Sequence, residues 1–142
     1  MPGTYGSALG VALVMGLNAL AASTPYPRLT VWFATLAIVP LSIVVTARAL
    51  RFFREEDPQV IVVDEVAGQS LTLLPLAGEP ATGFSYWLAV FVGFVLFRAL
   101  DAIKPYPIWK LGHLKGAWGV VADDLAAGIV AAALLLAFLR FL

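Results

Sequence analysis

The sequence predicts an all-α protein, a polytopic membrane bundle of about five helical segments with its functional site at the cytoplasmic interface. Composition is the first observation, because 61% of the 142 residues are hydrophobic and only 13% are charged, whereas soluble domains carry about 25% charged residues. Second, the apolar residues form stretches long enough for helices to cross about 30 Å of hydrocarbon. Third, acidic residues within these stretches gather near one end of the bundle. We expect a single domain over residues 1–142.

Charge and cysteine content exclude several classes of function. The net charge is zero, and the basic residues are too few and too dispersed to follow a nucleic-acid backbone, so we expect no nucleic-acid partner. The chain has no cysteine, which excludes disulfides, a thiolate nucleophile and sulfur ligands for a metal.

The first two apolar stretches predict two spanning helices. Residues 4–22 carry no charge, and Gly6 and Gly10 form a GxxxG pattern that lets another helix backbone approach closely. Ordinary helix packing explains these glycines, and they would also suit a homo-oligomer. Residues 29–47 form the second span, which ends in RALRFFREED at 48–57, a pattern typical of a helix end at a headgroup surface.

Three further segments complete the predicted bundle. Asp57 and Pro58 offer an N-cap and a first helical residue for the third segment. Pro75 leaves open whether that segment crosses completely or turns back. Two later prolines, Pro105 and Pro107, stop the fourth segment. The predicted segments are 58–76, 84–102 and 118–140, with a short interfacial helix at 108–115.

Basic residues orient the bundle if all five segments cross. Seven of the nine lysines and arginines then lie on the side of the N-terminus, and only Arg28 and Arg140 lie opposite. Loops rich in lysine and arginine stay in the cytoplasm. The residues on the predicted cytoplasmic side are Arg48, Arg51, Arg54, Arg98, Lys104, Lys110 and Lys115.

Five carboxylates reach about the same depth in this arrangement. Asp64 and Glu65 lie near the start of an outgoing segment, Asp101 near the end of an incoming one, and Asp123 and Asp124 near the start of the last. Each charge that faces lipid costs roughly 2.5–3.5 kcal/mol on insertion scales. We therefore expect the five side chains to face one another, with cations between them.

Clustered carboxylates are hard oxygen ligands suited to Mg²⁺, and five could hold one ion or two. The predicted metal ligands are Asp64, Asp101, Asp123 and Asp124. For some of these acids a second interpretation stays open. Asp101 could pair with a nearby cation, Arg98 or Lys104, and Glu65 and Asp123 could support a ligand from behind.

Other polar residues on the same side could bind a phosphate. The stretch PGTYGS places the hydroxyls of Thr4 and Ser7 at the start of the first helix, where they could cradle a phosphate or simply cap the helix. Lys104 and Lys115 could meet a phosphorylated headgroup, whereas Lys110 fits a solvated loop. The only histidine, His113, is interpreted as an interfacial side chain.

Four blocks of residues together resemble the phosphatidylglycerophosphatase A family, whose bacterial members dephosphorylate phosphatidylglycerophosphate. The blocks are PGTYGS at 2–7, VVDEVAGQ at 62–69, FRALDAIKPYPI at 97–108 and KGAWGVVADDLAAG at 115–128. The resemblance implies an all-helical fold, Mg²⁺ dependence and a role in phospholipid biosynthesis. It also implies that the five acids, Arg98 and Lys104 belong to the active site. Family members usually carry a further stretch before the PGT block, whereas this sequence begins at Met1.

The expected function is therefore Mg²⁺-dependent hydrolysis of phosphatidylglycerophosphate to phosphatidylglycerol and phosphate, at the inner face of the bacterial cytoplasmic membrane. The expected catalytic residues are Asp64, Glu65 and Asp124. Attack by water and an aspartyl-phosphate intermediate both stay open. The alternative is a small proton or cation transporter, since intramembrane carboxylates also form relays. A relay needs polar steps across the full thickness, and the outer halves of the segments offer only Asn18, Ser42, Ser70 and Thr72.

Overall fold

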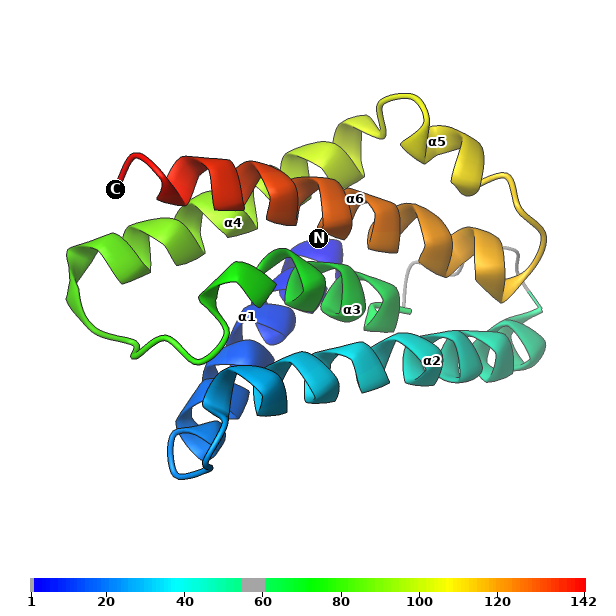
Figure 1. Ribbon diagram of the computed structural model, residues 1–142. Coiled ribbons are helices and arrows are strands. Elements are labelled where there is room, and N and C mark those ends of the chain that lie inside the picture. The colour runs from blue at the N-terminus through cyan, green and yellow to red at the C-terminus, as the bar shows by residue number, and fades with distance from the viewer. Residues whose placement is uncertain (1, 55–60) are drawn as a thin grey trace.

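The computed structural model describes residues 2–54 and 61–142, and this part of the chain is helical without any β-strand. Four helices are long and apolar enough to cross a membrane (Figure 1). Their positions confirm four of the five predicted segments to within a few residues, except that the second helix continues through Pro40 to Phe53. These helices are α1 (Pro2–Ala21), α2 (Pro27–Phe53), α4 (Gly83–Ile103) and α6 (Ala117–Leu139). The predicted short helix at 108–115 is the four-residue α5 (Ile108–Leu111).

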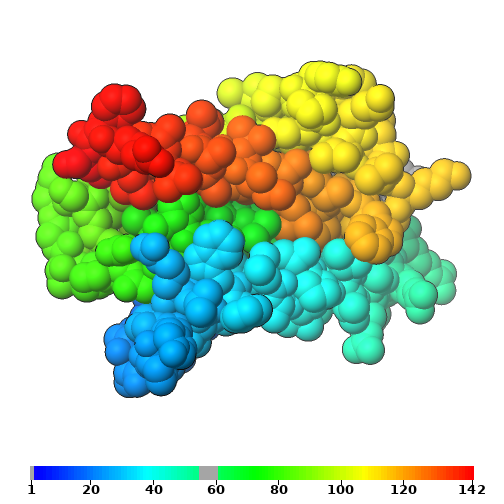
Figure 2. All heavy atoms as spheres, viewed as in Figure 1, coloured from blue at the N-terminus to red at the C-terminus, as the bar shows by residue number. Residues whose placement is uncertain are grey.

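The third segment contains a much shorter helix than predicted. Helix α3 runs over Val63–Thr72 and is followed by the 3₁₀ helix η1 (Leu74–Leu76). Ten helical residues extend about 15 Å, half the thickness of the hydrocarbon core, so the predicted spanning helix over 58–76 is corrected here. The expected N-cap at Asp57 and Pro58 lies outside the described residues. Helix α3 contacts α1, α2, α4 and α6, and in the space-filling view α2 and α6 leave little of it visible (Figure 2).

Helix α3 and η1 nevertheless run from one end of the bundle to the other. Gly6, near the start of α1, packs against Val62 at the start of α3. Near the end of α1, the Asn18 side chain donates to the Leu76 carbonyl (3.2 Å) and accepts from the Gly78 amide (2.8 Å). An ion pair between Arg28 and Glu79 (2.8 Å) joins the start of α2 to the loop after η1. The third segment therefore runs in the same direction as α1, as the alternating path predicts.

Glycines bring the backbones of α3 and α6 into contact. A Cβ atom at Gly68 would lie 2.6 Å from the carbonyl oxygen of Asp124 and 2.6 Å from the Phe97 ring, and Gly128 on α6 faces the backbone of Gly68. Hydrophobic side chains pack on both sides of this contact, with Leu73 and Leu135 among the most buried. Because α3 and α6 approach so closely, acids near the start of each helix can meet.

Candidate active site

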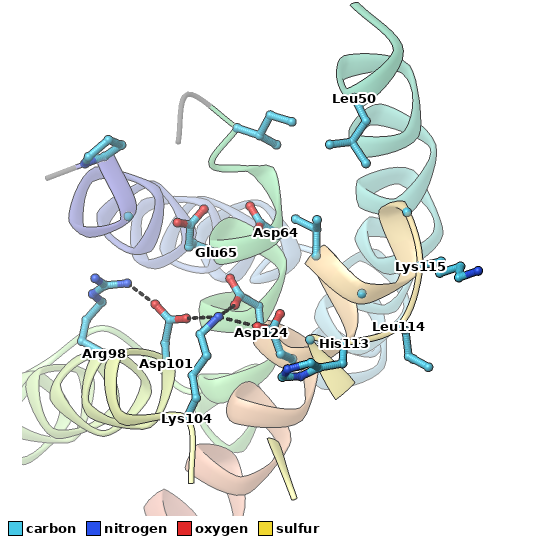
Figure 3. A pocket seen from close by; sticks show the side chains of 18 residues that line it. Leu50, Asp64, Glu65, Arg98, Asp101, Lys104, His113, Leu114, Lys115 and Asp124 are labelled. Atoms are coloured by element: carbon cyan, nitrogen blue, oxygen red, sulfur yellow. Dashed lines mark hydrogen bonds and ion pairs between the residues drawn. The ribbon is translucent and has the colours of Figure 1, made fainter. Parts of the chain in front are cut away.

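A pocket of about 950 Å³ lies at the end of the bundle where α1, α3 and α6 begin and α4 ends (Figure 3). Charged side chains of α3, α4 and α6 line it together with Lys104 after α4 and Lys115 before α6, and residues of the N-terminus and α2 also contribute to the lining. The charged residues that line it are Asp64, Glu65, Arg98, Asp101, Lys104, Lys115, Asp123 and Asp124.

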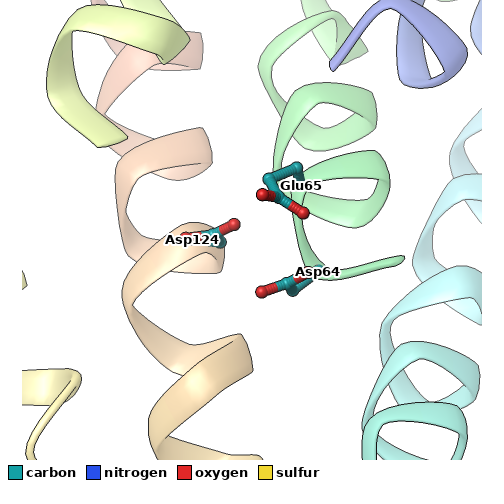
Figure 4. A group of neighbouring side chains, drawn as sticks. All are labelled: Asp64, Glu65 and Asp124. Carbon is teal, nitrogen blue, oxygen red and sulfur yellow. The ribbon is translucent and has the colours of Figure 1, made fainter. Parts of the chain in front are cut away.

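Three carboxylates form the centre of the pocket. One oxygen each from Asp64, Glu65 and Asp124 lies within 4.8 Å of the others, and all three side chains point into the space between α3 and α6 (Figure 4). Asp64 is 7% exposed and Asp124 is 3% exposed. Asp64 Oδ1 and Glu65 Oε2 are buried without a hydrogen-bond partner among the described residues. Like charges this close repel unless a cation lies between them, so the cluster fits a metal ion.

The cluster and the predicted ligand set share Asp64 and Asp124. Glu65 belongs to the cluster, whereas Asp101 and Asp123 are engaged by basic side chains. Arg98 forms an ion pair with Asp101, and Lys104 forms one with Asp123 (Figure 3). For Asp101, the structure therefore shows the alternative interpretation, an ion pair with a neighbouring cation.

Lys104 connects the carboxylates of α4 with those of α6. Its Nζ atom lies 3.8 Å from Asp101 Oδ1 and 3.9 Å from Asp124 Oδ1, in addition to its bond with Asp123. The residue caps α4 with a left-handed backbone conformation (φ 45°), which few non-glycine residues adopt. Burial lowers the pKa of Lys104, but the hydrogen bond to Asp123 and the surrounding negative charges outweigh it and raise the pKa overall. Lys104 therefore stays protonated beside the cluster.

The N-terminal block contributes its glycine to the site, and the two predicted hydroxyls lie elsewhere. Thr4 and Ser7 do not line the pocket, whereas Pro2 and Gly3 do. Ser7 is fully buried, and its hydroxyl donates to the Gly3 carbonyl (2.9 Å), a hydrogen bond within its own helix. A Cβ atom at Gly3 would lie 2.9 Å from Glu65 Oε1 and 3.0 Å from an Arg98 guanidinium nitrogen. Gly3, a residue without a side chain at the start of α1, is the feature of the sequence that could have indicated this close contact.

The loop before α6 forms another wall of the pocket. Lys115 lines it as predicted, and Lys110 does not. His113, interpreted from the sequence as an interfacial side chain, also lines the pocket, with its Nδ1 2.8 Å from the Trp109 carbonyl oxygen. Apolar side chains complete the lining, so one pocket offers both charged and apolar surfaces; they include Leu50, Ile61, Leu114 and Val120.

An all-helical bundle with four membrane-length helices, and with buried carboxylates beside arginine and lysine in a pocket at one end, defines a class of membrane enzyme suited to phosphate chemistry. The comparison with protein families agrees. The family model of phosphatidylglycerophosphatase A matches residues 1–139, and the chain belongs to this family. It is therefore a phosphatase, a phosphoric monoester hydrolase, and the family implies a phospholipid substrate.

Relatives carry related names. Phosphatidylglycerophosphatase A of Haemophilus influenzae is 30% identical over 131 residues, which cover 92% of this chain and 74% of the relative. Phosphatidylglycerophosphatase A of Escherichia coli K12 is 40% identical over 76 residues, 53% of this chain and 41% of the relative. A Bacteroides thetaiotaomicron protein with the provisional name phosphatidylinositol-3-phosphatase is 32% identical over 130 residues, 90% of this chain and 77% of the relative. No solved structure matches the chain. These phosphatase relationships do not favour the transporter alternative.

Proposed function

We propose that this protein hydrolyses phosphatidylglycerophosphate to phosphatidylglycerol and inorganic phosphate with the help of bound Mg²⁺. The observation that carries the proposal is the buried cluster of Asp64, Glu65 and Asp124, in one pocket with Arg98 and Lys104. The proposal includes a single membrane domain over residues 1–142, in the bacterial cytoplasmic membrane, with the pocket facing the cytoplasm. The excess of basic residues at the pocket end supports this orientation.

The donor set favours a hard divalent cation. Asp64, Glu65 and Asp124 offer only oxygen atoms, and two of these oxygens are buried without a protein partner. When bound, Mg²⁺ would polarise the phosphoryl group and offset its negative charge. These three carboxylates could bind one ion or two. Asp101 and Asp123 would contribute by holding Arg98 and Lys104 in place.

The surrounding residues suit a phosphomonoester. Arg98 and Lys104 would bind the phosphoryl oxygens, and Lys115, exposed at the rim, would meet the phosphodiester of the same lipid. In hydrolysis, a water oxygen attacks phosphorus while the bond from phosphorus to the glycerol oxygen breaks. Glu65 would accept the proton of the attacking water, and the departing glycerol oxygen takes up a proton. In the covalent route, a carboxylate oxygen of Asp64 would attack phosphorus while the bond from phosphorus to the glycerol oxygen breaks. Water would then hydrolyse the aspartyl-phosphate, which releases phosphate and restores the Asp64 carboxylate.

Phosphate release from synthetic phosphatidylglycerophosphate in detergent tests the proposal. We expect release by the wild type with Mg²⁺, its loss in excess EDTA and its recovery when Mg²⁺ is restored. Asp64→Asn keeps the shape of the side chain and removes its charge, so it should lower the rate by about 100-fold or more. Release that is insensitive to EDTA, or an unaffected Asp64→Asn variant, would contradict the metal site.

A phosphoinositide is the second candidate substrate. The provisional name of the Bacteroides relative supports it, and phosphatidylinositol 3-phosphate is also a phosphomonoester on a membrane lipid. The ratio of kcat/KM for the two lipids, measured in the same micelles, decides between them. We expect a higher kcat/KM for phosphatidylglycerophosphate. A higher value for the phosphoinositide would contradict the proposed substrate and identify the phosphoinositide as the preferred one.

A further inference from the structure

Gln69 is a fully buried side chain whose amide has no hydrogen-bond partner. Its exposure is 0%, and neither Nε2 nor Oε1 bonds to any group in the described part of the chain. Two other buried polar side chains near it on α3 are hydrogen-bonded. Ser70 donates to the Val66 carbonyl (2.7 Å), and the Thr72 hydroxyl lies within bonding distance of the carbonyls of Gly68 (3.0 Å) and of Gly128 on α6 (3.4 Å). Buried amides in proteins are nearly always hydrogen-bonded. The position of Gln69 therefore requires a separate explanation.

Gln69 lies directly behind Glu65 on the same side of α3. The two residues are four apart, and both face the glycines of α1: a Cβ atom at Gly6 would lie 3.1 Å from the Cβ of Glu65, and one at Gly10 would lie 2.8 Å from the Cβ of Gln69. A side chain on a helix covers the turn that precedes its own Cα atom. We therefore expect the Gln69 amide to lie over the turn that carries Glu65, whose Oε2 atom is also buried without a partner among the described residues.

We propose that Gln69 is a positioning residue that holds the Glu65 carboxylate in the cluster through a buried water molecule. Gln69 Nε2, Gln69 Oε1 and Glu65 Oε2 lie on successive turns of α3, and none of them has a partner among the described residues. One buried water binds two to four such polar atoms, so a single water could serve both side chains. Hydrogen bonds behind a ligand carboxylate fix its orientation toward the metal. What Glu65 does in the reaction rests on the proposed function, whereas its coupling to Gln69 does not.

Coupling between the two residues is tested with purified protein in detergent. The variants are Gln69→Leu, Glu65→Gln and the double variant, with Ser70→Ala as the matched control, since Ser70 is an adjacent buried polar residue that bonds to its own helix. Binding of Mn²⁺ followed by electron paramagnetic resonance, without substrate, reports on the metal site. Phosphate release gives kcat and KM, and thermal unfolding reports on the fold.

We expect Gln69→Leu to weaken Mn²⁺ binding and to lower kcat by about 10- to 100-fold each, with KM within about twofold of the wild type. The unfolding temperature should stay close to that of the wild type, because leucine has a similar volume and packs in the same buried site. In the double variant, Gln69→Leu should cause no further loss of Mn²⁺ affinity or kcat beyond that of Glu65→Gln alone. Ser70→Ala should bind Mn²⁺ like the wild type.

Two outcomes would overturn the inference: wild-type Mn²⁺ affinity in Gln69→Leu, or effects of Gln69→Leu and Glu65→Gln that simply add. A wild type that binds Mn²⁺ and shows the coupling, yet releases no phosphate from phosphatidylglycerophosphate, would overturn the proposed substrate and support the role of Gln69. Full activity in Gln69→Leu beside an active wild type would overturn the role of Gln69 alone.

Discussion

At the scale of single residues, the site depends on how closely the start of α1 approaches Glu65 and Arg98. Gly3→Ala places a methyl group 2.9 Å from Glu65 Oε1 and 3.0 Å from the Arg98 guanidinium, which forces a carboxylate and its neighbouring cation apart. We expect phosphate release to fall by about tenfold or more, a change of about 1.4 kcal/mol in transition-state stabilisation. Kinetics in detergent check this. Gly16→Ala on the same helix, where nothing lies within 4 Å, should retain wild-type activity, and equal losses in both variants would contradict the prediction.

The adjacent acids of α6 should have separable roles. Asp124 belongs to the carboxylate cluster, and Asp123 holds Lys104. Asp124→Asn should weaken Mn²⁺ binding and lower kcat by about 100-fold or more, because a ligand charge is lost. Asp123→Asn should mainly raise KM, by about tenfold, because Lys104 loses its charge-assisted bond. Titration of Mn²⁺ together with steady-state kinetics distinguishes them, and identical profiles for the two variants would refute the division.

The sequence predicted that these acids gather at one end of the bundle, but it did not predict the direction in which each one points around its helix. The insertion cost of charge placed five acids at one level. Successive residues on a helix point about 100° apart, so Asp123 and Asp124 cannot both face α3, and only packing decides which does. Gln69 carries no charge, so the same cost did not single it out. Glu65 belongs to the cluster because it lies between two helices: its Cβ packs near Gly6 of α1, and its carboxylate lies near Asp124 of α6.

At the scale of elements, α3 shows why an apolar stretch does not fix the length of a helix. A helix that faces lipid must satisfy its backbone across the whole hydrocarbon layer. Helix α3 is surrounded by α1, α2, α4 and α6, so it can end at Thr72 and continue as a 3₁₀ turn at Pro75. The four helices with lipid-facing residues were predictable from composition, whereas the inner one was not. The Gly6–Gly10 face of α1 packs on α3 of the same chain, so it is occupied within the monomer.

The contact between α3 and α6 should tolerate no added side chain at Gly68. An alanine Cβ would lie 2.6 Å from the Asp124 carbonyl oxygen and the Phe97 ring, and a backbone atom cannot move aside without shifting a helix. We expect a loss of about 1–3 kcal/mol in stability and weaker Mn²⁺ binding, because Asp64 and Asp124 move apart. Gly93→Ala is the control, since its Cβ would meet the ends of the Leu73, Leu135 and Thr72 side chains and no backbone atom among its three nearest neighbours. Thermal unfolding should show a smaller change there, and the reverse order would contradict this account of the contact.

At the scale of the whole molecule, both ends of the bundle have a distinct character. At one end, the loop after η1 is bonded to Asn18 of α1 and forms the Arg28–Glu79 ion pair with the start of α2. The opposite end holds the pocket and most of the basic residues. Since α3 and η1 pass from the pocket end to the loop end, the direction of each long helix is the one that five alternating segments require. The third segment is a short inner helix, whereas α1, α2, α4 and α6 have the length of a membrane span.

The absence of cysteine from the chain makes its orientation directly measurable. Ala81→Cys places a single thiol in the exposed loop after η1, and Lys110→Cys places one on the exposed surface of α5, outside the pocket lining. Because lysine and arginine collect at the pocket end, that end should face the cytoplasm. In intact cells, a membrane-impermeant maleimide should therefore label Ala81→Cys, and it should reach Lys110→Cys only after permeabilisation. Labelling of both variants in denaturant controls for thiol reactivity. The opposite pattern would place the pocket on the outer face, where a lipid phosphate made in the cytoplasmic leaflet would first have to cross the bilayer to reach Asp64.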